Sequence, residues 1–168
     1  MPTSSTRRTT TRRRRSSAVR AAIVVQRAAA APGAPGERRL RTIARAAARG
    51  ATQVTLRLVG AAEGRRLNRA FRGRDYATNV LTFPYGIART RGGKSLLQGD
   101  IVLCHPVIAR EAHAQRKPLA AHYAHLVVHG MLHLRGADHV RAHEAARMER
   151  AEARILRRLG FADPYAVE

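Results

Sequence analysis

The order of apolar and polar residues predicts that strands and helices alternate in the first part of the chain. Val54, Leu56 and Leu58 alternate with polar neighbours, which is the period of a strand with one buried face. In residues 37–49, Leu40 and Ile43 share one face among arginines, which predicts an amphipathic helix. The same reasoning predicts a second helix at 61–72 and further strands at 21–26, 79–86 and 99–104.

After residue 104 the pattern turns helical, with helices expected at 106–116, 118–135 and 141–159. Pro118 suits a first helical turn and Gly136 suits a helix stop.

Between the last two strands, residues 87–98 contain arginines and glycines and are interpreted as a basic loop. Pro84 places the preceding strand at a sheet edge, because proline cannot donate to a central ladder. The expected fold class is α+β (mixed α/β). It has one layer of about four strands, mostly parallel with one antiparallel edge strand, packed with about five helices.

A chain of 168 residues with 45% hydrophobic content fits one domain, which we assign to residues 19–168. Residues 1–18 form a basic segment too polar to bury a core, so we expect a disordered arm. An organelle transit peptide is an open alternative for this arm. The single cysteine, Cys104, excludes an internal disulfide and favours a cytoplasmic location.

The net charge of the chain indicates the kind of partner that it binds. The chain has 32 Lys+Arg against 11 Asp+Glu, a formal net charge of +21, which favours a polyanionic partner and nucleic acid first. A membrane surface is the competing explanation for this charge. The sequence has no apolar run approaching the roughly 18 residues that span a bilayer, so no membrane segment is expected.

The segment HGMLHLRGADH, residues 129–139, has the spacing of a metal site. His129 and His133 are four apart on a predicted helix, so they project from one face. Gly136 then ends the helix and allows the chain to bring His139 to the same ion. Three histidine ligands leave one position open, as in catalytic zinc sites, although nickel or cobalt would also suit them.

Metallopeptidases with this spacing carry a glutamate base where this chain has Gly130, which argues against a peptidase. Two interpretations of Gly130 stay open: room for a bulky substrate beside the ion, or close packing against another element. His125 is a rival ligand with a more probable role in packing or in support of a ligand. Asp138 is expected either to orient a ligand or relay a proton, or to cap a helix or form a turn. The remaining histidines, which are His105, His113, His122 and His143, are expected to be solvated or locally bonded.

These residues resemble the YbeY family of endoribonucleases, whose signature H-G-x-L-H-L-x-G-x-D-H is matched at every defined position. Three further segments are similar to the family: LNRAFRGRDYATNVLTFPYG, QGDIVLC and EAARMERAEARILRRLGF. Thr82 and Gln98 replace the family's usual serine and leucine. The likeness runs from about residue 20 to 162, so it leaves out the arm.

The resemblance implies a zinc-dependent, single-strand-specific endoribonuclease with a metal helix like that of the metzincins. It also implies action in maturation of the small-subunit ribosomal RNA 3′ end and in ribosome quality control, with ribosomal RNA and the small subunit as partners. His129, His133 and His139 would be the ligands of one Zn²⁺ per chain. Arg72 would be the functional cation, so the candidate catalytic residues are Arg72 and His133.

Two other functions remain open at this point. One is a non-catalytic ribosome assembly factor stabilised by zinc, and the other, less favoured, is a metallopeptidase. Thr78 and Asn79 are expected to order the start of the edge strand, with RNA contact as the weaker possibility. The charged residues at 89–94, together with the arm, are candidates for contacts to phosphates, which position RNA without reading its sequence.

Overall fold

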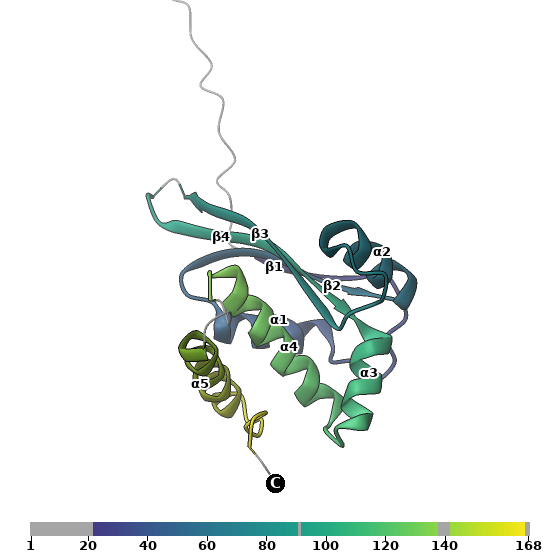
Figure 1. Cartoon of the computed structure of the whole chain (residues 1–168). Coiled ribbons are helices and arrows are strands. Elements are labelled where there is room, and N and C mark those ends of the chain that lie inside the picture. Colours follow the sequence, from purple (N-terminus) through teal and green to yellow (C-terminus); the bar gives the residue numbers. More distant parts are fainter. Residues whose placement is uncertain (1–21, 91, 138–141, 167–168) are drawn as a thin grey trace, which may run out of the picture.

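A computed structural model describes residues 22–90, 92–137 and 142–166, so the predicted arm at 1–18 lies outside the described residues. Figure 1 shows a sheet packed with helices. The strands are β1 (Ala22–Arg27), β2 (Ala51–Val59), β3 (Val80–Arg89) and β4 (Ser95–Cys104). The helices are α1 (Glu37–Ala47), α2 (Ala61–Arg72), α3 (His105–Ala114), α4 (Leu119–Leu134) and α5 (Ala142–Arg158).

The sheet has the strand order β1-β2-β4-β3. β1 pairs with β2, and β2 with β4, in parallel, whereas β3 pairs with β4 antiparallel. This arrangement confirms the predicted fold class, a mostly parallel sheet with one antiparallel edge strand. Pro84 lies on the edge strand β3 as predicted, next to a bulge between Pro84 and Gly86.

The prediction of a basic loop at residues 87–98 is wrong over most of its length. β3 continues to Arg89 and β4 begins at Ser95, and Arg89 pairs with Ser95 across the hairpin. Leu96 and Leu97 are buried, so the outer part of β4 is held by packing as well as by the ladder. Arginine and glycine residues in the hairpin interrupt the alternation of apolar and polar residues from which strands are predicted. The outer parts of both strands are therefore not predicted.

Helices cover the two faces of the sheet unequally, as Figure 1 shows. α1 and α4 pack on one face, where Leu40 and Ile43 of α1 join Ile101 of β4 in the larger core. α2 lies on the other face, where Leu67 packs against a smaller cluster that includes Val102. None of the described helices has the length and apolar character that crossing a bilayer would require.

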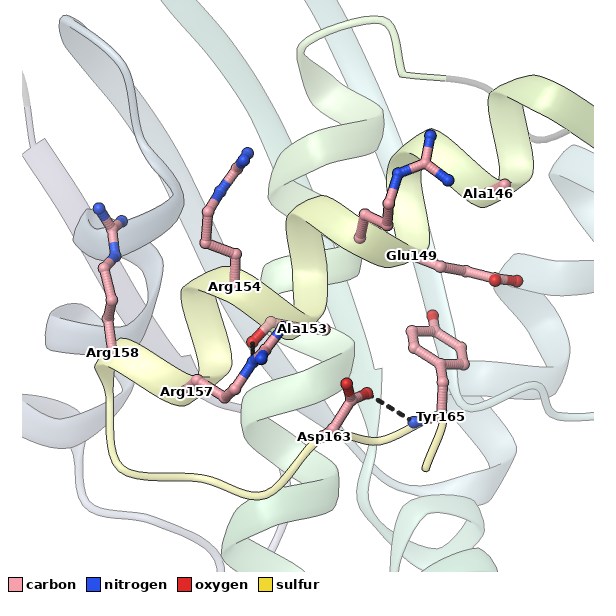
Figure 2. A pocket seen from close by; sticks show the side chains of 9 residues that line it. Ala146, Glu149, Ala153, Arg154, Arg157, Arg158, Asp163 and Tyr165 are labelled. Carbon is pink, nitrogen blue, oxygen red and sulfur yellow. Dashed lines mark hydrogen bonds between the residues drawn. The ribbon is translucent and has the colours of Figure 1, made fainter. Parts of the chain in front are cut away.

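The segment after α5 folds back along that helix (Figure 2). Lys117 Nζ donates a 3.0 Å hydrogen bond to the Pro164 carbonyl, which ties the segment to the chain just before α4. The backbone N–H of Tyr165 donates to Asp163 Oδ1 at 3.0 Å. These contacts place the Tyr165 ring beside α5 and α4.

Gly99 sets the distance between α4 and the sheet. A Cβ at this position would lie 2.6 Å from Leu134 Cδ2 and 2.7 Å from the Phe83 carbonyl oxygen. The second atom belongs to the backbone and cannot rotate away. The end of α4 can therefore approach β4 only over a residue that has no side chain.

We predict that Gly99→Ala destabilises the fold by about 1–3 kcal/mol, the usual cost of an added methyl in a well-packed place. The matched control is Gly92→Ala, because a Cβ at Gly92 meets nothing within 4 Å. Urea unfolding followed by circular dichroism measures both. Equal unfolding free energies for the two variants would show that the contact with Leu134 can relax without cost.

Candidate metal centre

Three histidines of α4 are only half-buried, whereas the residues around them on this helix are buried. In α4 the residues between positions 122 and 134 are buried except at 125, 129 and 133, which are half-buried. Residues four apart share a face of a helix, so His125, His129 and His133 form one row. Apolar packing on the other sides fixes the rotation of α4 and thereby the direction of this row.

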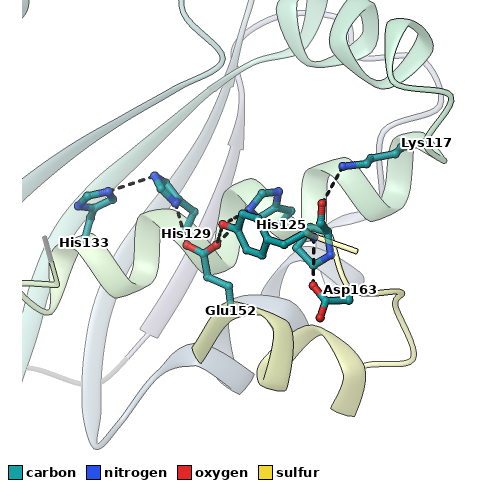
Figure 3. Close-up of polar contacts among 8 residues, drawn as sticks. Lys117, His125, His129, His133, Glu152 and Asp163 are labelled. Carbon is teal, nitrogen blue, oxygen red and sulfur yellow. Dashed lines mark hydrogen bonds and ion pairs between the residues drawn. The ribbon is translucent and has the colours of Figure 1, made fainter. Parts of the chain in front are cut away.

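His129 and His133 bring their outer ring nitrogens together. The two Nε2 atoms lie 3.0 Å apart and the ring centroids 4.5 Å apart (Figure 3). Two imidazole nitrogens on one tetrahedral zinc, each at 2.0–2.1 Å, would lie about 3.3 Å apart. The pair therefore fits two ligands of a shared ion with a shift of a few tenths of an ångström.

A buried carboxylate holds the inner side of the same histidines. Glu152, on α5, has no exposed surface. Its Oε1 accepts from His129 Nδ1 at 2.8 Å, and its Oε2 accepts from His125 Nε2 at 3.0 Å (Figure 3). The Tyr165 hydroxyl also donates to Oε2. Three hydrogen-bond donors thus satisfy one buried carboxylate.

The hydrogen bonds decide the charge of Glu152. Burial by itself would raise the pKa of this carboxyl, but the bonds from His125, His129 and Tyr165 outweigh burial and lower the pKa to about 2. The ionised carboxylate only accepts, so His129 carries its proton on Nδ1. The lone pair of His129 is then on Nε2, the atom that faces His133, which is the tautomer that binds a metal.

A second group of possible ligands overlaps the first. His125, His129 and Glu152 each offer one ligand atom, and these atoms lie within 4.8 Å of one another, so the three residues could hold a metal ion. In the structure both histidines instead donate to the carboxylate. His125 also approaches the Tyr165 hydroxyl, at 3.1 Å. These contacts agree with the expectation that His125 packs or supports a ligand.

The end of α4 turns as predicted. Gly136 has φ +82°, the left-handed conformation, and its N–H donates to the His133 carbonyl at 2.9 Å. Ala137 N–H donates to the Leu132 carbonyl at 3.1 Å, which completes the helix stop. The predicted third ligand His139 and the neighbouring Asp138 lie outside the described residues.

Gly130 faces the sheet and not the histidine row. It is buried, and a Cβ there would lie 3.0 Å from two side-chain carbons of Ile101 and 3.2 Å from Thr82 Cγ2. The packing interpretation is therefore favoured, and the bare backbone makes room for β3 and β4. A glutamate at this position would have to displace core side chains.

Arg72 and the histidines come from different layers of the fold. It is the exposed last residue of α2, which packs on the face of the sheet opposite α4. The neighbouring Phe71 contacts Phe83 of the edge strand β3, with ring centroids 4.9 Å apart. Arg72 is thus carried close to the edge of the sheet, while the histidines come from the layer on its other face.

Two histidines expected to be solvated or bonded locally are buried and bonded to more distant residues. His105 Nδ1 lies 2.9 Å from the Tyr123 hydroxyl. His122 Nε2 lies 2.8 Å from Glu111 Oε2, which also accepts from Asn79 Nδ2 at 3.0 Å. Asn79 therefore orders the start of β3, as expected. The expectation for His105 and His122 is wrong, because α3 packs against α4 and encloses both rings.

Sequence reasoning missed Glu152 and Tyr165. A signal for Glu152 exists, because it lies four residues after Met148 and four before Leu156, in the buried row of an amphipathic helix. A carboxylate in such a row requires a partner. Nothing in the sequence of the terminal segment distinguishes Tyr165, because its contact depends on how the chain folds back after α5.

Comparison with known proteins gives the family. The model described as "Endoribonuclease YbeY" matches residues 37–160. The chain is 56% identical over 133 residues to an endoribonuclease YbeY from Aromatoleum aromaticum, covering 79% of this chain and 82% of the relative. It is 62% identical over 113 residues to one from Bordetella pertussis, covering 67% and 69%.

Two further matches are another relative and a solved structure. An endoribonuclease YbeY from Methylobacillus flagellatus is 52% identical over 134 residues, covering 80% of this chain and 86% of the relative. The solution structure of TM1509 from Thermotoga maritima is 23% identical, with a TM-score of 0.47, covering 87% of this chain and all of that one. The family model and the close relatives confirm the predicted resemblance: the chain belongs to the endoribonuclease YbeY family.

Proposed function

We propose that this protein is a zinc-dependent endoribonuclease that cuts single-stranded RNA, with one Zn²⁺ held by His129, His133 and His139. The observation that carries the proposal is the pair of Nε2 atoms 3.0 Å apart, one of them on a ring oriented by a buried carboxylate. This is the carboxylate–histidine arrangement that supports metal ligands in proteins. The spacing of the sequence supports His139 as the third ligand.

Zinc is the metal that best suits three imidazoles with one open position. When bound, it supplies an activated water and a positive charge beside the scissile phosphate. Glu152 keeps the proton of His129 on Nδ1, so Nε2 stays available as a ligand. His133 serves as a ligand and as part of the catalytic centre.

The substrate follows from charge and from family. A net charge of +21 attracts a polyanion, and the relatives carry the name endoribonuclease. We infer that the RNA is ribosomal and is matured at the 3′ end of the small subunit, that the protein also serves ribosome quality control, and that both occur in the cytoplasm. Residues 19–168 act as one domain, and the arm at 1–18 adds contacts to phosphates.

Arg72 is the proposed phosphate-binding cation. Its planar guanidinium offers two parallel N–H donors, which match two oxygens of a phosphate that gains charge in the transition state. Its position at the end of α2, next to β3, favours a strand of RNA that passes over the edge of the sheet. In this arrangement Arg72 approaches the phosphate from the side opposite α4.

The two competing functions, a metallopeptidase and a non-catalytic assembly factor, require different features of the site. A metallopeptidase needs a base after the first histidine, and a side chain in place of Gly130 would have to push Ile101 and Thr82 aside. An assembly factor needs the metal for folding only. Zinc-loaded protein that associates with ribosomal subunits but never cuts RNA would favour that alternative.

We predict that His133→Ala loses most bound zinc and nearly all RNA cleavage, because two ligands cannot hold the ion with one position open. Metal analysis and a nuclease assay on single-stranded RNA measure both effects, with about one zinc per chain expected in the wild type. His143→Ala is the control, because the side chain of His143 is 74% exposed on α5. Full zinc content in His133→Ala would reject the ligand set.

Arg72→Ala should retain zinc and fold and lower the rate of RNA cleavage roughly a hundredfold, the usual effect of removing one donor to a transition-state oxyanion. Arg69→Ala removes the same charge one turn earlier on the exposed surface of α2 and should cleave nearly as the wild type does. Single-turnover kinetics separates the chemical step from binding. Equal rates for the two variants would exclude the assigned role.

For Glu152→Gln we expect zinc affinity to fall roughly 10–100-fold, as is common when the group that supports a ligand is changed. A neutral amide no longer fixes the proton of His129 on Nδ1. Competition with a chromophoric chelator gives the affinity without an activity assay. Glu149→Gln, on the exposed side of α5, is the control. If Glu152→Gln binds zinc as the wild type does while its circular dichroism is unchanged, Glu152 does not orient His129.

A further inference from the structure

A groove lined by arginine lies at the C-terminal end of α4. Its walls are the end of α1, the end of α4 and the length of α5. Six arginines line it: Arg49, Arg135, Arg147, Arg150, Arg154 and Arg158. Among the described residues of the lining, Glu144 is the one acid. The groove thus concentrates positive charge in one place.

None of the ion pairs among the described residues engages the arginines of the groove. Arg135 Nη1 donates to the Ala47 carbonyl at 3.2 Å, and Arg158 Nη2 donates to the Ala46 carbonyl at 3.4 Å. Both bonds use backbone oxygens at the end of α1, so among the described residues neither guanidinium is held by a carboxylate.

The groove favours the arrival of an anion. Burial lowers the pKa of Arg135, and repulsion by Arg49 lowers it further. These two guanidiniums repel each other in a partly buried place. A negative group that binds between them offsets this repulsion, so its binding is favourable. Guanidinium is the side-chain group that best fits the paired oxygens of a phosphate.

The shape of the charged row fits a chain of phosphates. Arg147, Arg150, Arg154 and Arg158 follow one another along α5 at helical spacing, a row roughly 16 Å long. Arg154 and Arg158 extend from this helix in Figure 2. A row of this length can contact several successive phosphates of one strand, as basic grooves that follow a nucleic-acid backbone do.

We infer that this groove binds the phosphate backbone of RNA at a site distinct from the metal centre. The inference rests on the proposed function for the identity of the polyanion. Leu132 and Arg135 line the groove and flank His133 in the sequence, so one end of the groove meets the helix end that carries the metal site. A strand bound along α5 would continue toward the histidines.

A protein partner suits the groove less well. Stable protein interfaces are anchored by exposed aromatic or apolar side chains. The large apolar side chains of this lining, those of Leu132, Met148 and Ile155, are all buried. An acidic polypeptide would find charge here but no anchor, whereas a phosphate backbone needs charge alone.

The test is the salt dependence of RNA binding by the full chain. Arg150→Gln combined with Arg154→Gln removes two exposed charges from the groove. Arg38→Gln combined with Arg110→Gln removes two exposed charges from α1 and α3 and keeps the net charge of the two double variants equal. A single-stranded 2′-O-methyl oligouridylate is the probe, and fluorescence anisotropy measures its binding over a range of salt. Gel electrophoresis checks that the probe stays whole.

The groove variant should bind about tenfold more weakly at low salt. Its slope of log affinity against log salt should be smaller by about 1.4, since each contact to a single strand contributes about 0.7. The control should keep a slope close to that of the wild type. Equal slopes for both double variants would overturn the inference. Stronger loss of poly-L-glutamate binding than of RNA binding would also overturn it, in favour of an acidic protein.

Failure of the inference is separable from failure of the proposed function. A wild type that cuts RNA, with a groove variant that binds like the control, rejects the groove and keeps the nuclease. A wild type that cuts no RNA, with a groove variant that loses the predicted slope, keeps the groove and rejects the nuclease. Zinc content, measured in parallel, should be equal in all three proteins because the groove contributes no ligand.

Discussion

The structure of the candidate metal centre depends on one buried carboxylate. An ionised group without exposed surface is costly unless hydrogen bonds satisfy it, and Glu152 receives donors from His125, His129 and Tyr165. These donors come from α4 and from the segment after α5, while the carboxylate comes from α5 itself. Satisfying Glu152 therefore fixes three parts of the chain relative to one another. The orientation of His129 is a consequence of that packing.

Two glycines determine the position of α4 together with its apolar side chains. Gly99 lets Leu134 approach β4, and Gly130 lets the middle of the helix approach Ile101 and Thr82. Most other residues of α4 between positions 122 and 134 are apolar and buried, so rotation of the helix would bury histidine and expose leucine or valine. This packing consequently fixes the direction in which the row of histidines points. A site preorganised in this way loses little free energy to reorganisation when it binds an ion.

Much of the fold follows from local pattern, and the parts that do not have identifiable reasons. Alternating Val54, Leu56 and Leu58 specify a strand without any tertiary information, and Gly136 specifies a helix stop by its backbone freedom alone. The long β3–β4 hairpin escaped prediction because pairing across it, and not apolar periodicity, extends both strands. The role of Glu152 depends on how α5 lies against α4, which sequence spacing does not encode. His129 and His133 were identifiable because their spacing is itself the geometry of the site.

The distribution of charge explains how one chain can combine a carboxylate at its metal centre with a polyanionic substrate. Glu152 lies behind the histidines, without exposed surface, and its charge is balanced by three donors. A phosphate that approaches the histidines from solvent meets imidazole rings first, and the ring of His129 lies between it and the carboxylate. Coulomb repulsion falls with distance and is weakened further by the hydrogen-bonded donors. A glutamate in the open, as peptidases have, would repel the same phosphate directly. Burying the carboxylate keeps its effect on the ligand and removes its effect on the substrate.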